Sequence, residues 1–81
     1  MNKFRLKVAQ IDKLLFDDDV VSLNCPGVEG EMTILAHHIP LITLLKEGAL
    51  KIKVDEDTQK EIPLKGGVLE VGKEETIVLL S

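Results

Sequence analysis

The residues able to bind a metal or act as nucleophiles are few and poorly arranged for chemistry. His37 and His38 are adjacent, and neighbouring side chains on a strand point to opposite faces, which makes them a poor two-ligand site. A zinc site needs a third and a fourth ligand nearby, and Cys25 is the only thiol. We therefore expect one packed and one exposed histidine, and a Cys25 that serves as a small buried hydrophobic residue.

The other reactive groups lie in no catalytic context. Ser22, Ser81 and the four threonines form no nucleophile elbow or triad-like pattern. The pair Gly66-Gly67 lacks the Lys-Ser or Lys-Thr of a phosphate loop and precedes a predicted strand instead of a helix. We expect no catalytic residue, no metal and no cofactor in this chain.

Two carboxylates stand apart from the rest. Glu29 and Glu31 flank Gly30, and with Pro26 and Gly27 just before them the sequence predicts a short exposed loop over residues 25–31. A loop held between turn residues presents its acidic groups outward from a rigid scaffold, as binding loops commonly do. On the residues alone, a simple solvated turn remains the preferred alternative.

Composition bounds the scaffold that must position these residues. A chain of 81 residues is a single domain that buries ~60% of its unfolded surface. Apolar residues make up 44% and charged residues 30%, a globular balance. The net charge of −4 and the absence of Trp and Tyr argue against a nucleic-acid partner. No apolar run approaches the ~18 residues of a membrane span, and the charged residues at positions 1–7 do not suit a signal peptide. A single cysteine cannot form an internal disulfide, so we expect a protein of the reducing cytoplasm.

Alternation of apolar and polar residues predicts an all-β fold. The first segment places Phe4, Leu6 and Val8 on one face, and a slip in phase after Val8 indicates a bulge or the end of the strand. The three adjacent carboxylates Asp17–Asp19 are expected to form a turn. Further strands are predicted at residues 20–25, 31–36, 50–54, 62–64, 68–71 and 76–80.

Turn signals about every ten residues indicate an antiparallel sandwich or barrel, with about eight to ten short strands. One segment is ambiguous, because Leu41, Leu44 and Leu45 have helical spacing between Pro40 and Gly48, whereas Ile42 and Thr43 suit a strand equally well.

One pattern of residues stands out in the middle of the chain: Cys25-Pro26-Gly27-Val28-Glu29-Gly30-Glu31, followed by Ile34-Leu35, His38, Pro40-Leu41 and Lys46-Glu47-Gly48. This pattern resembles the N-terminal domain of the epsilon subunit of rotary F-type ATP synthases. Gly66-Gly67-Val68-Leu69-Glu70-Val71 and Thr76-Ile77-Val78-Leu79 match its final strands in order and spacing. The resemblance covers essentially the whole chain, residues 1–81. It implies a small flattened antiparallel β-sandwich in which residues 41–46 form a strand.

The resemblance also implies a function. The family's domain is a non-catalytic part of the central stalk, packed on the gamma subunit and resting on the c-ring, so that it couples ion flow to ATP synthesis from the cytoplasmic face of the bacterial inner membrane. Glu29, Gly30 and Glu31 would then contact basic loops of the c-ring, and His38, Pro40 and Thr43 would contact gamma. An isolated sandwich that exposes an aliphatic face is expected to self-associate weakly.

The sequence also departs from the family pattern. Thr33, Ala36 and Ile39 replace the usual glycine, proline and small residue, and Asp17–Asp19 replace a glycine-bearing turn. Most bacterial members continue into a regulatory helical hairpin, whereas the printed sequence stops at Ser81. Without that hairpin we expect no ATP binding by this chain.

Two other function classes remain open. One is a freestanding β-sandwich adaptor or ligand-binding module that shares only the fold. The other is an enzyme, which the missing nucleophile, base and metal constellations make the weakest alternative.

Overall fold

The computed structural model describes residues 2–81 and contains strands but no helix in that range. The strands are β1 Phe4–Gln10, β2 Lys13–Val20, β3 Ser22–Gly27, β4 Gly30–Leu35, β5 Leu41–Leu45, β6 Gly48–Lys53, β7 Gln59–Leu64, β8 Gly67–Val71 and β9 Glu75–Leu80. The all-β prediction is confirmed, as is a strand at residues 41–45 in place of the helix that local spacing also allowed. None of the described residues belongs to a helix that could cross a membrane.

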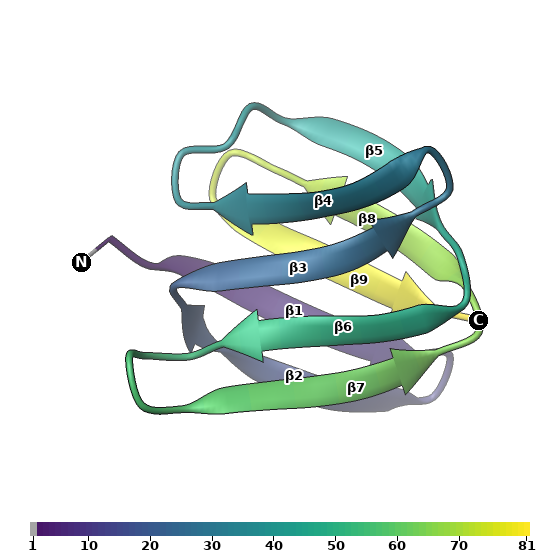
Figure 1. Ribbon diagram of the computed structural model, residues 1–81, viewed down its shortest axis with the longest axis horizontal. Coiled ribbons are helices and arrows are strands. Elements are labelled where there is room, and N and C mark those ends of the chain that lie inside the picture. The colour runs from purple at the N-terminus through teal and green to yellow at the C-terminus, as the bar shows by residue number, and fades with distance from the viewer. Residues whose placement is uncertain (1) are drawn as a thin grey trace.

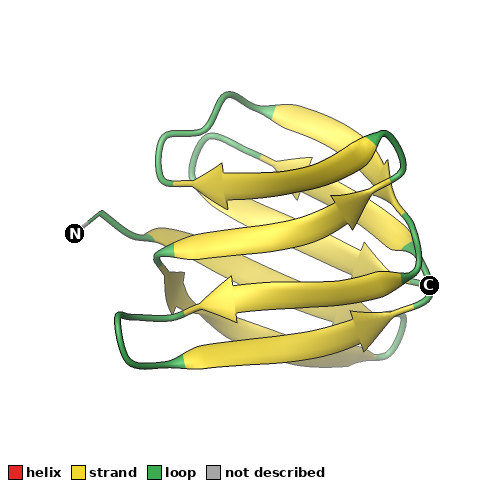
Figure 2. Cartoon of the chain, viewed as in Figure 1, coloured by secondary structure: helices red, strands yellow, loops and turns green. Residues whose placement is uncertain are grey.

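The strands form two layers (Figure 1). One layer has the order β2-β1-β9-β8-β5 and the other the order β4-β3-β6-β7. A single bridge between Gly27 of β3 and Leu45 of β5 joins them along one side. On the opposite side the ammonium of Lys60 lies 5.6 Å from the ring centre of Phe16, between β7 and β2. The result is a sandwich of 30 × 23 × 22 Å with loops at both ends of the strands (Figure 2).

The core lies between the layers and is almost entirely aliphatic. Leu6 and Val8 of β1 are fully buried, as the alternation predicted. The phase slip after Val8 is a register shift in the β1–β2 pairing, which confirms the predicted bulge. Inward side chains from both layers complete the core: Val20, Leu23, Cys25, Ile34, Leu45, Leu50, Ile52, Leu64, Leu69, Val71, Val78 and Leu80.

The predicted turn at Asp17–Asp19 is wrong, because these residues belong to β2 and pair with β1. The guanidinium of Arg5 lies 2.8 Å from the Asp17 carboxylate and 3.5 Å from that of Asp19. Asp17 and Asp19 share one face of the strand, so a single cation on β1 offsets their repulsion. The hydrogen bond with Asp17 is also the main reason why the pKa of Arg5 is raised. Charges on this edge strand oppose pairing with other chains.

One pairing departs from the expected antiparallel pattern. β1 and β9 run parallel, with Arg5 opposite Glu75 and Ala9 opposite Leu79. Every other pairing is antiparallel. β1 and β9 lie nearly a whole chain length apart in sequence, and alternation within each strand carries no information about its partner. The sheet is therefore mixed, although the all-β class holds.

Candidate functional site

The acidic turn between β3 and β4 lies at one end of the sandwich. The predicted loop over residues 25–31 is shorter than expected, because only Val28 and Glu29 form the turn and the flanking residues pair as strands. Gly30 has φ of 135°, a conformation that residues with a Cβ rarely adopt. Gly27 must also be small, since a Cβ there would lie 2.7 Å from the Gly30 carbonyl oxygen.

The acidic turn is anchored to the segment that follows β5. The Val28 amide donates to the Leu44 carbonyl at 3.0 Å, and the Lys46 amide donates to the Pro26 carbonyl at 2.8 Å. Gly48 packs so closely on Pro26 that a Cβ on Gly48 would lie 3.0 Å from the proline ring. These contacts join the acidic turn to the segment between β5 and β6, and they fix the position from which the turn presents its side chains.

Glu29 and Glu31 are both exposed. Within residues 2–81 neither carboxylate takes part in an ion pair. Both are available to a partner outside this chain, and the anchored backbone keeps them in place. The structure therefore agrees with the predicted outward presentation of these two groups, while their binding partner stays a prediction.

The loop of residues 36–40, between β4 and β5, lies at the other end of β4. His37 has φ of 67° and is exposed, whereas His38 is half-buried. The amide of His38 donates to the Leu35 carbonyl at 3.2 Å. Its ring Nδ1 lies 2.8 Å from the Ile39 carbonyl oxygen. A carbonyl only accepts, so Nδ1 is the donor in this contact, and Nε2 is left without a partner among the described residues.

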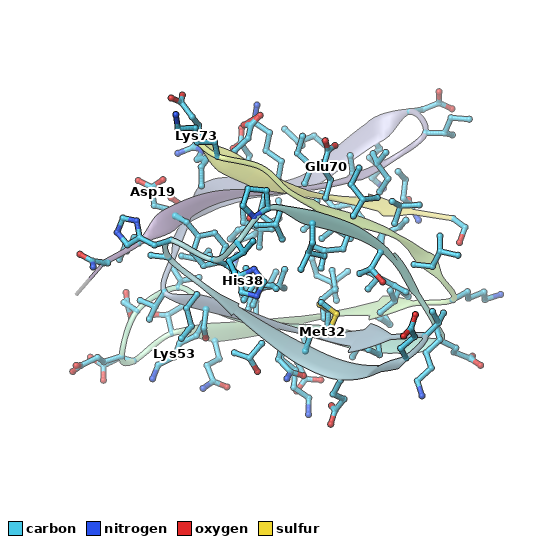
Figure 3. All side chains as sticks on the ribbon, turned by 90° about the horizontal axis from the view of Figure 1, so that it is seen from above. Asp19, Met32, His38, Lys53, Glu70 and Lys73 are labelled. Atoms are coloured by element: carbon cyan, nitrogen blue, oxygen red, sulfur yellow. The ribbon has the colours of Figure 1, made fainter. Side chains whose placement is uncertain are left out.

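Figure 3 looks into the sandwich from the β4–β5 side and shows His38 between the two layers. Pro40 follows in the same loop and is exposed, and Thr43 lies further along β5 with a half-buried side chain. The structure thus brings His38 and Pro40 into one loop but places Thr43 at mid-strand. Ile39 lies between His38 and Pro40 and is 78% exposed. The sequence marked Ile39 as a departure from the family pattern and gave no sign that its side chain is accessible.

The acidic turn and the His38–Pro40 loop lie at opposite ends of β4 (Figure 1), whereas Thr43 lies in the middle of β5. In the view of Figure 1 the acidic turn is at the right and the loop of residues 36–40 at the left. Six residues of extended strand separate them by about 20 Å. The strand predicted at residues 31–36 already implied a separation of this kind, and β4 confirms that strand.

Other groups with reactive potential are not assembled for chemistry. Cys25 is fully buried, and desolvation raises the pKa of its thiol to about 11, which keeps it protonated and unreactive at neutral pH. The described residues contain no group of three His, Cys, Asp or Glu side chains able to hold a metal ion. A hollow of about 310 Å³ beside His37 and His38 is lined by both acidic and basic side chains, among them Lys73 and Glu74.

Comparisons with known proteins identify relatives of this chain. An ATP synthase epsilon chain of Dehalococcoides mccartyi strain BAV1 is 38% identical over 79 residues, 98% of this chain and 56% of the relative. The ATP synthase epsilon chain of Wolbachia pipientis wMel is 36% identical over 81 residues, 100% of this chain and 71% of the relative. The chain thus spans about half the length of the Dehalococcoides relative.

Solved structures share the fold at low sequence identity. A chain in the cryo-EM structure of Euglena gracilis mitochondrial ATP synthase, OSCP/F1/c-ring in rotational state 1, superposes with a TM-score of 0.89 at 21% identity, over 96% of this chain and 50% of that one. A chain in the Tetrahymena thermophila mitochondrial ATP synthase central stalk and c-ring gives 0.82 at 15% identity, over 98% and 63%. The family model for the ATP synthase Delta/Epsilon chain β-sandwich domain matches residues 3–81, and the chain belongs to that family.

Proposed function

We propose that this chain is a non-catalytic rotor subunit of an F-type ATP synthase, which connects the gamma subunit to the c-ring and helps couple ion flow to ATP synthesis. Membership of the Delta/Epsilon family supports an ATP synthase role. The rest of the proposal is supported by the positions of Glu29–Glu31 and of His38 with Pro40, which lie at opposite ends of β4. A connector needs two separated binding surfaces and a body that resists shear between them.

At the c-ring end, Glu29 and Glu31 face solvent from the anchored turn. Basic loops on a ring of c subunits would pair with these carboxylates. Ion pairs at an exposed interface fix register and raise the association rate more than they add affinity. This contact should therefore orient the subunit on the ring, and its strength should fall as ionic strength rises.

At the gamma end, His38 and Pro40 offer a shallow surface with both apolar and hydrogen-bonding character. Nε2 of the His38 ring forms a hydrogen bond with gamma, while Nδ1 stays on the Ile39 carbonyl, and the exposed Ile39 side chain packs against gamma. Thr43 contributes at the margin, because its side chain is half-buried. In this arrangement the chain lies at the cytoplasmic membrane surface through its partners, without inserting into the bilayer.

The test is binding of tagged chain to purified gamma subunit and, separately, to purified c-ring. Glu31→Lys should lose c-ring binding and keep gamma binding, whereas H38A should do the reverse. Glu61→Lys is the matched control, because it makes the same charge change on an exposed position of β7, away from both ends.

Recovery of gamma together with c subunits from solubilised native membranes would support the proposal. A folded chain that recovers neither would favour the adaptor alternative. Loss of both partners in either single variant would contradict the assignment of two separate contact sets.

A further inference from the structure

The outer face of the five-stranded layer carries a row of apolar side chains that crosses all five strands, three of them exposed and two, Ala9 and Val68, half-buried. Strand register places them side by side, Leu14 opposite Ala9, Ala9 opposite Leu79, Leu79 opposite Val68, and Val68 opposite Leu44. Leu14, Leu79 and Leu44 are 58%, 53% and 57% exposed. We name these five residues the apolar row. Contiguous exposed apolar surface on a small domain marks a site of association.

A second row, one step along the same strands, carries opposite charges on either side of β9. It reads Asp17, Lys7, Ile77, Glu70 and Ile42 from β2 to β5. Lys7 on β1 and Glu70 on β8 are each one strand away from the central Ile77. Figure 3 shows Glu70 pointing away from the opposite layer. Within residues 2–81 Glu70 makes no ion pair, and the ammonium of Lys7 makes only a long one, 3.4 Å from Glu75.

We propose that a second copy of this chain covers this face, related by a twofold axis that runs along β9. Such an axis lays β1 of one copy over β8 of the other, because these strands flank β9 symmetrically. The position of each row along the strands is unchanged by the rotation. Lys7 of each copy therefore faces Glu70 of the other, so these two positions are complementary in charge. Glu75, on the outer face of β9, meets Glu75 of the other copy, and the neighbouring Arg5 and Lys7 offset that repulsion.

The apolar row is complementary in size under the same rotation. Leu79 packs on Leu79 at the axis, the small Ala9 faces the larger Val68, and Leu14 faces Leu44. Face-to-face sheets pack with their strands about 30° apart, which an axis inclined by about 15° to β9 produces. The match between the two copies is then closest near the axis, where Leu79, Lys7 and Glu70 lie. A closed twofold contact of this kind stops at a dimer.

The size of the contact predicts a weak dimer. Five strands spaced ~4.8 Å apart and about 20 Å of strand length give a footprint of roughly 500 Å² per copy, or ~1,000 Å² in total. That area is at the lower limit for specific association, about 1,000 Å². A contact this small that lacks large aromatic anchors should have a dissociation constant of about 10 to 100 μM.

Sedimentation equilibrium of the 81-residue chain tests this directly. Over roughly 5 to 500 μM, a range that spans the expected constant, the average mass should rise from 9.0 kDa toward twice that value. Glu70→Lys and Lys7→Glu should each weaken the dimer about tenfold or more, because like charges then face each other twice. The double variant Lys7→Glu with Glu70→Lys should restore it, since the two charges are exchanged and still meet.

Leu35→Lys is the matched control, because Leu35 is 54% exposed but lies on β4 in the other layer. It should leave the dimer unchanged, whereas Leu79→Lys should abolish it, and circular dichroism confirms that each variant is folded. A monomer at every concentration overturns the inference, as does a dimer that ignores Glu70→Lys. The inference concerns the free chain, so its failure leaves the gamma and c-ring binding results unaffected.

Discussion

Gly27→Ala tests whether the acidic turn depends on the close approach of Gly27 to Gly30. An added Cβ would lie 2.7 Å from the Gly30 carbonyl oxygen and 3.1 Å from Sδ of Met32. The sulfur belongs to a flexible side chain and can move, but the carbonyl oxygen is part of the backbone of the turn. The strands must separate by about 0.7 Å to restore an ordinary contact of 3.4 Å, and overpacking of this kind costs about 1–3 kcal/mol.

The cost should appear as a fall in melting temperature. A chain of 81 residues has an unfolding entropy of roughly 170 cal/mol/K, so that 1 kcal/mol lowers the melting temperature by about 6 °C. We expect Gly27→Ala to lower it by about 6 to 18 °C, measured by circular dichroism or calorimetry at a concentration low enough to keep the chain monomeric.

Gly66→Ala is the matched control. Its Cβ would lie 3.2 Å from the Ser81 hydroxyl, at the end of a movable side chain, and 3.5 Å from the nearest backbone atom. Both changes reduce the entropy of the unfolded chain by the same amount, and the difference between the variants isolates the clash. Equal melting temperatures for the two variants would refute the reasoning, since the close approach would then carry no energy.

Three further predictions concern the core, the thiol and the edge strand. Leu50→Ala should lower the free energy of unfolding by about 2–5 kcal/mol, because Leu50 is fully buried; Leu35→Ala, at an exposed position, should change it by less than about 0.5 kcal/mol in the same urea titration. The pKa of the Cys25 thiol is raised from 9.0 to about 11 in the folded chain, so the folded state holds its proton more tightly than the unfolded state. The contribution of the thiol to stability is complete below pH 9 and is lost as pH rises toward 11, by up to about 2 kcal/mol. In urea titrations at rising pH, the free energy of unfolding should therefore fall less steeply for Cys25→Ala than for the unaltered chain. Equal slopes for the two proteins would contradict the assignment. Arg5→Ala should lower stability at low salt, because Asp17 and Asp19 are then left without their shared cation. That effect should vanish near about 1 M salt, and a salt-independent loss would point to packing instead.

Local alternation was enough to predict most strands but not their partners. Leu6 and Val8 are buried as their spacing indicated. Alternate side chains of a strand share one face, so the spacing shows which residues are buried without showing which strand covers them. The turn at Asp17–Asp19 was predicted from the repulsion among three adjacent carboxylates. The Arg5 guanidinium that offsets this repulsion lies on another strand, so local sequence could not show it. The parallel pairing of β1 with β9 was equally out of reach, since it depends on how the whole chain is folded.

Only the local part of the candidate site could be predicted from the sequence, because contacts between distant segments leave no local pattern. Turn residues and charge identified the acidic pair Glu29 and Glu31, which the structure shows exposed on an anchored turn. The anchoring hydrogen bonds to Leu44 and Lys46 could not be predicted, because they join segments that only the sandwich brings together. The apolar row was missed because it consists of single residues from five strands, and no one segment contains the pattern.

The parallel contact between β1 and β9 also sets the order of events when the chain folds. β9 lies between β1 and β8 in the larger layer, yet it is the last of the nine strands to leave the ribosome. Until then, the β1–β2 hairpin has no sheet to join, and β8 leaves one edge bare. Pairings between distant parts of a chain form slowly, and unpaired edges invite aggregation. We therefore expect β1 and β8 to lack their shared hydrogen-bonded neighbour in the nascent chain until β9 inserts between them and completes the sheet.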